Sequence, residues 1–182
     1  MGHYGSKELA QGFRTVRKNT LEAARDIPED KYDFCPAPDC LSVEKLLTHI
    51  ALSYRFQHRI HAIEKRFSMA GFDFPEMMAE LGAKEAEPRT KSQVIAMLDD
   101  EGEIWATFLD RVSDEFLAET VSSLPEFSQP PKSRLEMILS VKEHEIHHRG
   151  QVMLVQRMPG IVPHLTRQRE ERMAQTRAAE AS

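Results

Sequence analysis

The sequence predicts an all-α protein, most simply an antiparallel four-helix bundle. Four long segments repeat their apolar residues every three or four positions, Pro and Gly mark the connections, and hairpin signals are nearly absent. The 182 residues, 41% hydrophobic and 29% charged, are enough for one domain with a sizeable core. We therefore expect one bundle domain over residues 1–166 and a charged tail or helix extension over residues 167–182.

The first two helices are delimited by local signals. The first is predicted over Lys7–Arg25, and Pro28 follows its end. The second is predicted to begin after Ser42, a good N-cap residue, and to continue to about Phe67. Each presents one apolar face, as expected for a helix that packs in a bundle.

The remaining elements follow from the same signals. A connection of low periodicity, Ser68–Arg89, has room for a short helix at Pro75–Leu81. Thr90 opens the third helix, and the fourth is predicted over Ser133–Met158, where Pro159 stops it. Facing helices of such a bundle are a usual location for metal sites.

Composition excludes several classes of protein. The net charge of −5 and the absence of a basic stripe argue against a nucleic-acid-binding protein. No apolar run approaches the roughly eighteen residues of a membrane span, and Met1–Ala10 lacks the apolar core of a secretory signal. We expect a cytoplasmic protein without a membrane or nucleic-acid partner.

The two cysteines, Cys35 and Cys40, do not have the surroundings of a zinc finger. Such a site needs two more ligands nearby, and none has the required spacing. We expect two loop thiols in a reducing compartment, while a substrate-reactive thiol stays open as an alternative.

The most informative motif is the run from His144 to Gln151. His144 and His148 project from one helix face, one turn apart, and both fall within the apolar stripe. Imidazoles that point inward need partners, and a shared metal ion supplies one for each. The alternative is a pair of ordinary hydrogen-bonded histidines. His147 lies about 100° away on helical geometry, as a partner of a ligand or a group facing substrate.

His49 is the candidate for a third ligand because it lies in the apolar stripe of another long helix. His58 is about 180° from it and is expected to face solvent, while His61 is about 120° away. The set His49, His144 and His148 leaves at least one coordination position for water or substrate, the pattern expected of a catalytic metal site.

Three further polar residues are candidates for roles beside this metal. Glu145 is expected to act as a general base. Glu101 falls on the apolar face of the third helix, where it would be a fourth ligand or a partner of a ligand imidazole. Its alternative is contact with water or an ion pair with Arg or Lys. Gln151 is expected on the inner side of its helix, in a structural hydrogen bond that can also support a ligand.

These motifs together resemble the DinB/YfiT superfamily of metal-binding four-helix bundles. The resemblance rests on Ser-Val-x-x-Leu-Leu-x-His at Ser42–His49, on His-x-x-x-His-Arg-Gly-Gln at His144–Gln151, and on Arg-Met-Pro-Gly at Arg157–Gly160. It covers about Lys7–Pro163. It implies the same three histidine ligands, a divalent metal such as zinc or nickel, and a homodimer. It also implies a small-molecule substrate, with relatives that include thiol S-transferases and isomerases using bacillithiol or mycothiol.

The expected function is therefore that of a metal-dependent hydrolase or thiol S-transferase, with a low-molecular-weight thiol as an additional cofactor in the second case. A non-catalytic metal-binding stress-response bundle is the alternative. A further alternative is a metalloprotease, because His144-Glu145-x-x-His148 also matches H-E-x-x-H. In that arrangement Glu170 or Glu171 would supply the third ligand.

Overall fold

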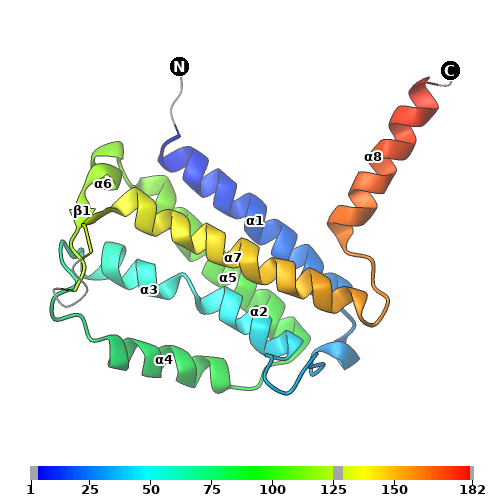
Figure 1. Cartoon of the computed structure of the whole chain (residues 1–182), viewed down its shortest axis with the longest axis horizontal. Helices are drawn as coiled ribbons and strands as arrows, with labels where there is room; N and C mark the ends of the chain where they lie inside the picture. The colour runs from blue at the N-terminus through cyan, green and yellow to red at the C-terminus, as the bar shows by residue number, and fades with distance from the viewer. Residues whose placement is uncertain (1–3, 125–128, 181–182) are drawn as a thin grey trace.

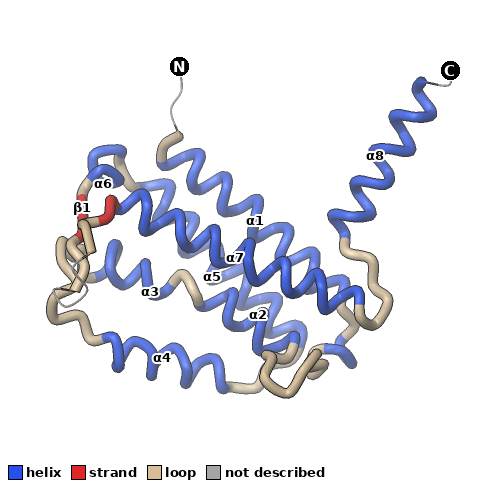
Figure 2. The backbone as a smooth tube through the Cα atoms, viewed as in Figure 1, coloured by secondary structure: helices blue, strands red, loops and turns tan. Residues whose placement is uncertain are grey.

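The computed structural model describes residues 4–124 and 129–180, and it is almost entirely helical (Figures 1 and 2). Its α-helices are α1 (Ser6–Asp26), α2 (Val43–Leu52), α3 (Arg55–His58), α4 (Phe74–Ala86), α5 (Lys91–Arg111), α6 (Asp114–Ala118), α7 (Arg134–Arg157) and α8 (His164–Glu180). The other elements are a 3₁₀ turn η1 (Glu29–Lys31), a π-helical turn η2 (Arg59–Ile63), and the strands β1 (Thr120–Val121) and β2 (Lys132–Ser133).

Four helical segments form the bundle, which confirms the predicted fold class. Helices α1 and α2 each pack against both α5 and α7, so α1 and α2 lie diagonally opposite one another. The chain direction in Figure 1 shows α1 and α7 running one way, and α2 and α5 the other. Helix α2 therefore meets α7 in antiparallel orientation, and this pair of neighbours carries the three candidate histidines.

The bundle helices begin at the polar residues that the sequence indicates. The Ser42 hydroxyl accepts a hydrogen bond from the amide of Lys45 and caps α2. Thr90 and Gln93 form a reciprocal capping box at the start of α5. Ser133 caps α7 in the same way. The caps at Ser42 and Ser133 set where α2 and α7, the two helices that supply the histidines, begin.

The second predicted helix differs from the structure, because it is not one continuous helix. It breaks at a turn after α2, where the Ser53 hydroxyl donates to the Ile50 carbonyl. A hydroxyl that bonds to the preceding turn competes with the helical ladder and bends the chain. Helix α3 then widens into η2, where the amide of Glu64 donates to the Arg59 carbonyl five residues earlier. Such π turns are frequent at functional sites.

Helix α4 is longer than the short helix predicted at Pro75–Leu81. The Asp73 side chain caps its first turn, and Lys45 of α2 donates from Nζ to the carbonyls of residues 85–87 at 2.8–3.0 Å. The free backbone groups at both ends of α4 thus have hydrogen-bond partners. The periodicity of the sequence does not reveal these partners, so the prediction was too short. Met77 is the one residue of α4 that is buried, so α4 lies along the outside of the bundle (Figure 1).

The last parts of the chain add little to the bundle. Strands β1 and β2 pair antiparallel, Thr120 opposite Ser133 and Val121 opposite Lys132. Helix α8 projects away from the bundle (Figure 1). Its first residue, His164, is buried and lies with Nε2 3.2 Å from Asn19 Oδ1 of α1, while the rest of the helix is mostly exposed.

Three groups of buried apolar residues hold the fold together. Two fill the bundle, one around Leu47 and Leu98 and the other around Phe13 and Trp105. The third lies where α4 meets the rest of the molecule and consists of Ile60, Met69, Phe72, Met77 and Val121. Within the described ranges, no helix has the length and apolar character needed to cross a membrane.

Candidate metal centre and its pocket

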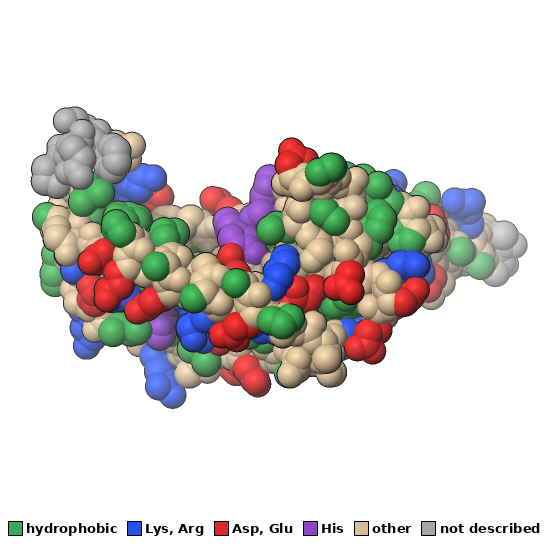
Figure 3. Space-filling view, turned by 90° about the horizontal axis from the view of Figure 1, so that it is seen from below, with side chains coloured by type: hydrophobic (Ala, Val, Ile, Leu, Met, Phe, Trp, Pro, Cys, Tyr) green, Lys and Arg blue, Asp and Glu red, His purple; other side chains and the backbone are tan. Residues whose placement is uncertain are grey.

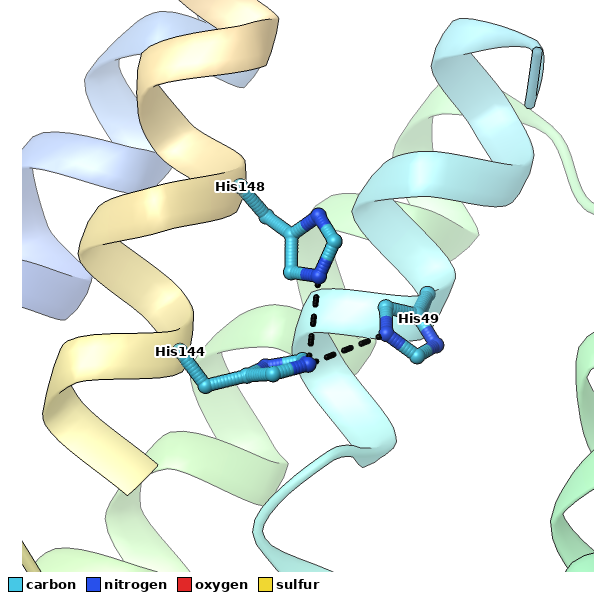
Figure 4. A group of neighbouring side chains, drawn as sticks. All are labelled: His49, His144 and His148. Carbon is cyan, nitrogen blue, oxygen red and sulfur yellow. Dashed lines mark hydrogen bonds between the residues drawn. The ribbon is translucent and has the colours of Figure 1, made fainter. Parts of the chain in front are cut away.

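Three histidine side chains converge between α2 and α7 (Figure 4). The Nε2 atom of His144 lies 3.3 Å from Nε2 of His49 and 3.1 Å from Nε2 of His148. The three ligand-type nitrogens all lie within 4.8 Å of one another, and in the described part of the chain they form the one such group of His, Cys, Asp or Glu. The structure thus brings together the three residues that the sequence indicates.

Hydrogen bonds at the outer nitrogens orient two of these rings. His49 Nδ1 lies 2.8 Å from Glu85 Oε1, and His148 Nδ1 lies 2.8 Å from Gln151 Oε1. Both partners are oxygen acceptors, so each ring donates its Nδ1–H, and in the neutral tautomer Nε2 is the unprotonated nitrogen that faces the centre. Partners of this kind hold metal-ligating imidazoles in the correct tautomer.

His144 and His148 are partly buried and favour the neutral form. Burial, together with the neighbouring His148 and His49, lowers the pKa of His144 to about 4. Burial also lowers the pKa of His148. In the described structure, Nδ1 of His144 is buried without a hydrogen-bond partner. Neutral imidazoles with free Nε2 lone pairs are the form that binds a metal ion.

The arrangement fits a divalent cation. Two lone pairs, from His49 and His148, point at the ring nitrogen of His144, and a shared cation would be a partner for all three. Two nitrogen ligands of a tetrahedral zinc ion lie about 3.3 Å apart, close to the separations here. Three imidazoles are a donor set suited to zinc, nickel and similar metals.

One side of the histidine cluster opens into a pocket. The cavity has a volume of about 390 Å³ and lies between α2, α3, α4 and α7. Figure 3 shows histidine side chains gathered at a hollow in the surface. Its lining residues are His49, Ser53, Phe56, Gln57, Met78, Leu81, Gly82, Glu85, Ser140, Val141 and His144. A metal held by the histidines would therefore face a cavity large enough for a small molecule.

The expectation that Glu145 acts as a general base is corrected by the structure. Its side chain is fully buried and turns toward α1, where Arg17 Nε lies 2.9 Å from Oε1 and the Thr20 hydroxyl donates to Oε1 at 2.7 Å. A carboxylate enclosed in this way cannot accept a proton from water or substrate. Gly102 allows the contact, because a Cβ there would meet the Arg17 side chain at 2.9 Å.

Glu101 also lies away from the histidines, so the expectation that it supports or completes the metal site is wrong. Its carboxylate accepts hydrogen bonds from the Tyr54 hydroxyl at 2.6 Å and from Arg55 Nε at 2.8 Å. The ion pair with arginine was the alternative interpretation of this residue. The broken second helix explains the pairing, since Tyr54 and Arg55 lie at the turn between α2 and α3.

The other two predicted supporting residues are at the site but on its outer side. Gln151 is exposed rather than inward, yet it bonds to His148 as described. His147 is exposed, with Nε2 3.3 Å from Gln151 Nε2, and its ring packs on that of His148. The pair therefore extends the hydrogen-bonded surroundings of one ligand.

Several residues that could have competed for these roles lie elsewhere. His58 is half-buried against Trp105, although the helical phase predicts that it faces solvent. Cys35 and Cys40 are exposed free thiols. Glu170 and Glu171 are exposed on the projecting α8, so with Glu145 buried the metalloprotease arrangement is not formed.

Sequence reasoning missed Glu85, Lys45 and Gln57 as parts of the site. Glu85 and Lys45 belong to the junction of α4 with α2, and the length of α4 was underestimated. Gln57 could have been found from its spacing. His49, Ser53 and Gln57 are each four residues apart, which places all three along the side of the second helical segment that faces the pocket.

Comparison with known proteins agrees with this fold. Residues 13–152 match the DinB superfamily, and the chain belongs to that superfamily. A curated relative is the uncharacterized protein YjoA of Bacillus subtilis (strain 168), which is 26% identical over 155 residues, 85% of this chain and 91% of YjoA.

Two solved structures share the fold. The crystal structure of the DinB-like protein YjoA from Bacillus subtilis has a TM-score of 0.61 at 20% identity, over 84% of this chain and 92% of the other. The second is YfiT of Bacillus subtilis, described as a probable metal-dependent hydrolase with an unusual four-helix bundle topology. It has a TM-score of 0.66 at 14% identity, over 88% of this chain and 91% of YfiT.

Proposed function

We propose that this protein is a metal-dependent enzyme that hydrolyses a small molecule in the pocket beside His49 and His144. The single observation that carries the proposal is the convergence of three imidazole nitrogens at the wall of a cavity of about 390 Å³. The description of YfiT as a probable metal-dependent hydrolase, on the same fold, supports it.

The coordination geometry favours an enzyme over a purely structural metal site. Structural zinc sites are closed by four protein ligands, whereas catalytic sites keep a position for water or substrate. Within residues 4–124 and 129–180, no fourth His, Cys, Asp or Glu joins the three histidines. This supports the enzyme over the non-catalytic alternative.

The protein's own residues would hold and shape the reaction site. His49, His144 and His148 bind the cation, and Glu85 fixes the ring of His49 by accepting its Nδ1–H. A bound divalent cation supplies Lewis acidity, which lowers the pKa of water or of a thiol so that a nucleophile forms near neutral pH. Met78, Leu81 and other apolar side chains line one side of the pocket.

Lewis acidity would activate a thiol in the same way as water, so thiol S-transfer is tested together with hydrolysis. The experiment is to load the purified protein with zinc or nickel in separate preparations and to assay p-nitrophenyl esters for hydrolysis. Each preparation is then assayed for thiol addition to an electrophile such as monochlorobimane, with bacillithiol and mycothiol as donors.

The variant His144→Ala is the negative control, because it removes the central ligand. Turnover that needs both the metal and His144 supports the enzyme. If metal binds at the three histidines but neither reaction is faster with the wild type than with the variant over the whole panel, the hydrolase and transferase proposals are wrong.

A further inference from the structure

A chain of four buried or half-buried side chains leads from the surface of the bundle to the pocket. Arg134 Nε donates to Glu119 Oε2 at 2.8 Å, and Arg134 Nη1 lies 2.9 Å from His61 Nδ1. On the other side of the imidazole, His61 Nε2 lies 3.1 Å from Gln57 Oε1. Gln57 lines the same pocket as His49 and His144.

The protons in this row of hydrogen-bonded side chains can be assigned by starting from Arg134. An arginine guanidinium only donates, so His61 Nδ1 must accept the hydrogen bond from Arg134. The imidazole proton is then on Nε2, and it is donated to Gln57, whose oxygen must face His61. Both rings that flank Arg134, Phe67 at 4.9 Å and Phe116 at 4.6 Å, hold the guanidinium in place.

This assignment fixes what Gln57 offers to a ligand. Its oxygen is occupied by His61, so its NH₂ group is left for the pocket, and no partner for that group is found in the described residues. His61 is 1% exposed and Arg134 is 1% exposed, so the arrangement does not depend on water. The orientation of the amide is therefore set before any ligand arrives.

The other polar side chains of the pocket do not donate into it. The hydroxyls of Ser53 and Ser140 donate to carbonyls of their own helical segments, Ile50 at 3.1 Å and Met137 at 2.6 Å. Glu85 is an acceptor, and the lining contains no Lys or Arg among the described residues. Gln57 is thus the fixed donor beside the histidines.

We propose that the NH₂ group of Gln57 binds the oxygen of an uncharged acyl group, such as an ester or amide carbonyl, and that His61 and Arg134 position it. This proposal rests on the proposed function, and it names the substrate class for the same site. In the metal-free protein a free carboxylate is disfavoured, because the lining supplies Glu85 and, among the described residues, no Lys or Arg to balance a negative charge. The apolar side chains of Phe56, Met78 and Leu81 accommodate the hydrocarbon part of the acyl compound.

The test uses N,N-dimethylbutyramide, a probe that accepts a hydrogen bond and cannot donate one. It is titrated into metal-free ¹⁵N-labelled protein, and the side-chain amide signals of Gln57 are identified by their loss in Gln57→Met. We expect a saturable downfield shift of these signals. We also expect about fivefold to tenfold weaker binding to Gln57→Met, the range for loss of one neutral hydrogen bond. The matched control is Gln168→Met on the exposed face of α8, which should bind the probe as the wild type does.

The positioning role of His61 has its own variants. His61→Phe removes both hydrogen bonds, and the probe should bind about as weakly as it binds to Gln57→Met. His61→Gln restores an acceptor for Arg134 and a donor for Gln57, so it should recover most of the affinity. Gln57→Glu keeps the acceptor for His61 but removes the donor, and it should also bind weakly.

Equal affinity of the wild type and Gln57→Met for the probe, or binding without a shift of the Gln57 signals, overturns the proposal. So does the absence of binding to the wild type. Because the titration is made without metal, its outcome is separate from the metal-dependent assays. A normal Gln57 response in a protein that binds no metal would refute only the proposed function.

Discussion

Glu85 Oε1 lies 2.8 Å from His49 Nδ1, although the two residues are 36 positions apart and belong to different helices. This contact joins α4, which lies outside the bundle, to the histidine cluster within it. Lys45, one turn before His49 on α2, donates to the final carbonyls of α4 and holds Glu85 at this position. The orientation of a candidate metal ligand thus depends on the docking of an external helix.

Replacing either flanking histidine should remove the metal. His49→Ala and His148→Ala each leave two protein ligands, so each should lose most of the bound metal, whereas the wild type should bind about one ion per chain. Elemental analysis after dialysis measures this directly. Glu143→Ala is the control, since Glu143 is exposed on the same helix as His148 and does not line the site. Full stoichiometry in either ligand variant would show that the metal is bound elsewhere.

Glu85→Gln should weaken metal binding without abolishing it. The substitution keeps the shape of the side chain but removes the carboxylate that accepts the His49 Nδ1–H. Loss of such a partner typically costs about 10–100-fold in metal affinity. Competition with a chromophoric chelator gives the dissociation constant. Glu87→Gln, two residues further on and paired with Arg89, should bind metal as the wild type does. Unchanged affinity in Glu85→Gln would mean that the contact does not tune the ligand.

Glu145→Gln should act on stability and not on metal content. The variant leaves Arg17 buried without its counter-charge, and breaking a buried ion pair costs about 3–5 kcal/mol of unfolding free energy. Urea unfolding of the metal-free protein measures the loss. Glu143→Gln, exposed on the same helix, should unfold like the wild type. A stable Glu145→Gln variant would contradict a structural role for the pair.

The same pair offers a second comparison. In the double variant Arg17→Met with Glu145→Leu, neither charge remains buried, and much of the lost stability should return. A double variant as unstable as Glu145→Gln would instead place the cost in the packing around Gly102, where the Arg17 side chain lies against the α5 backbone.

Stability should fall in mild acid, in part because of His61. Burial, together with the positive charge of the neighbouring Arg134, lowers the pKa of His61 to about 4. In the unfolded chain a histidine has a pKa of about 6.5. The unfolded state therefore binds the proton first. The contribution of the neutral folded imidazole is fully present above about pH 6.5 and is lost as the pH falls toward about 4.

Between about pH 7.5 and about pH 5 this group alone should account for a loss of about 2 kcal/mol. His144 and His148 titrate in the same direction, so the His61 share is the difference between the wild type and His61→Gln in urea unfolding at both pH values. Identical pH dependence in the two proteins would show that His61 is not held neutral by its surroundings.

The sequence predicted the fold class and the convergence of the histidines for one physical reason. Helical periodicity fixes which residues share a face, and an apolar stripe fixes which face is inward. His144 and His148 share a face by spacing alone, and His49 lies on the corresponding face of α2. Neither inference needs the detailed arrangement of the helices.

The errors concern contacts that depend on that arrangement. Periodicity placed Glu145 about 100° from its neighbour His144, but it did not reveal that α1 lies on that side and supplies Arg17 as a partner. For Glu101 the ion pair is found and the role at the metal site is not, because the turn that presents Tyr54 and Arg55 interrupts a segment predicted as one helix. Metal identity, a homodimer and a cytoplasmic location stay predictions.

Helix α4 has a further consequence, which concerns the lifetime of any bound ligand. It forms the outer wall of the pocket, yet Met77 is its one buried residue, and Lys45 and Glu85 supply polar contacts near its C-terminal end. Segments with so little buried surface open locally at low free energy while the core stays folded. We therefore expect the backbone amides of α4 to exchange with deuterium sooner than those of α5 and α7, and ligand release to quicken when α4 partly detaches. The helix that orients His49 would then also set how long a product stays beside it.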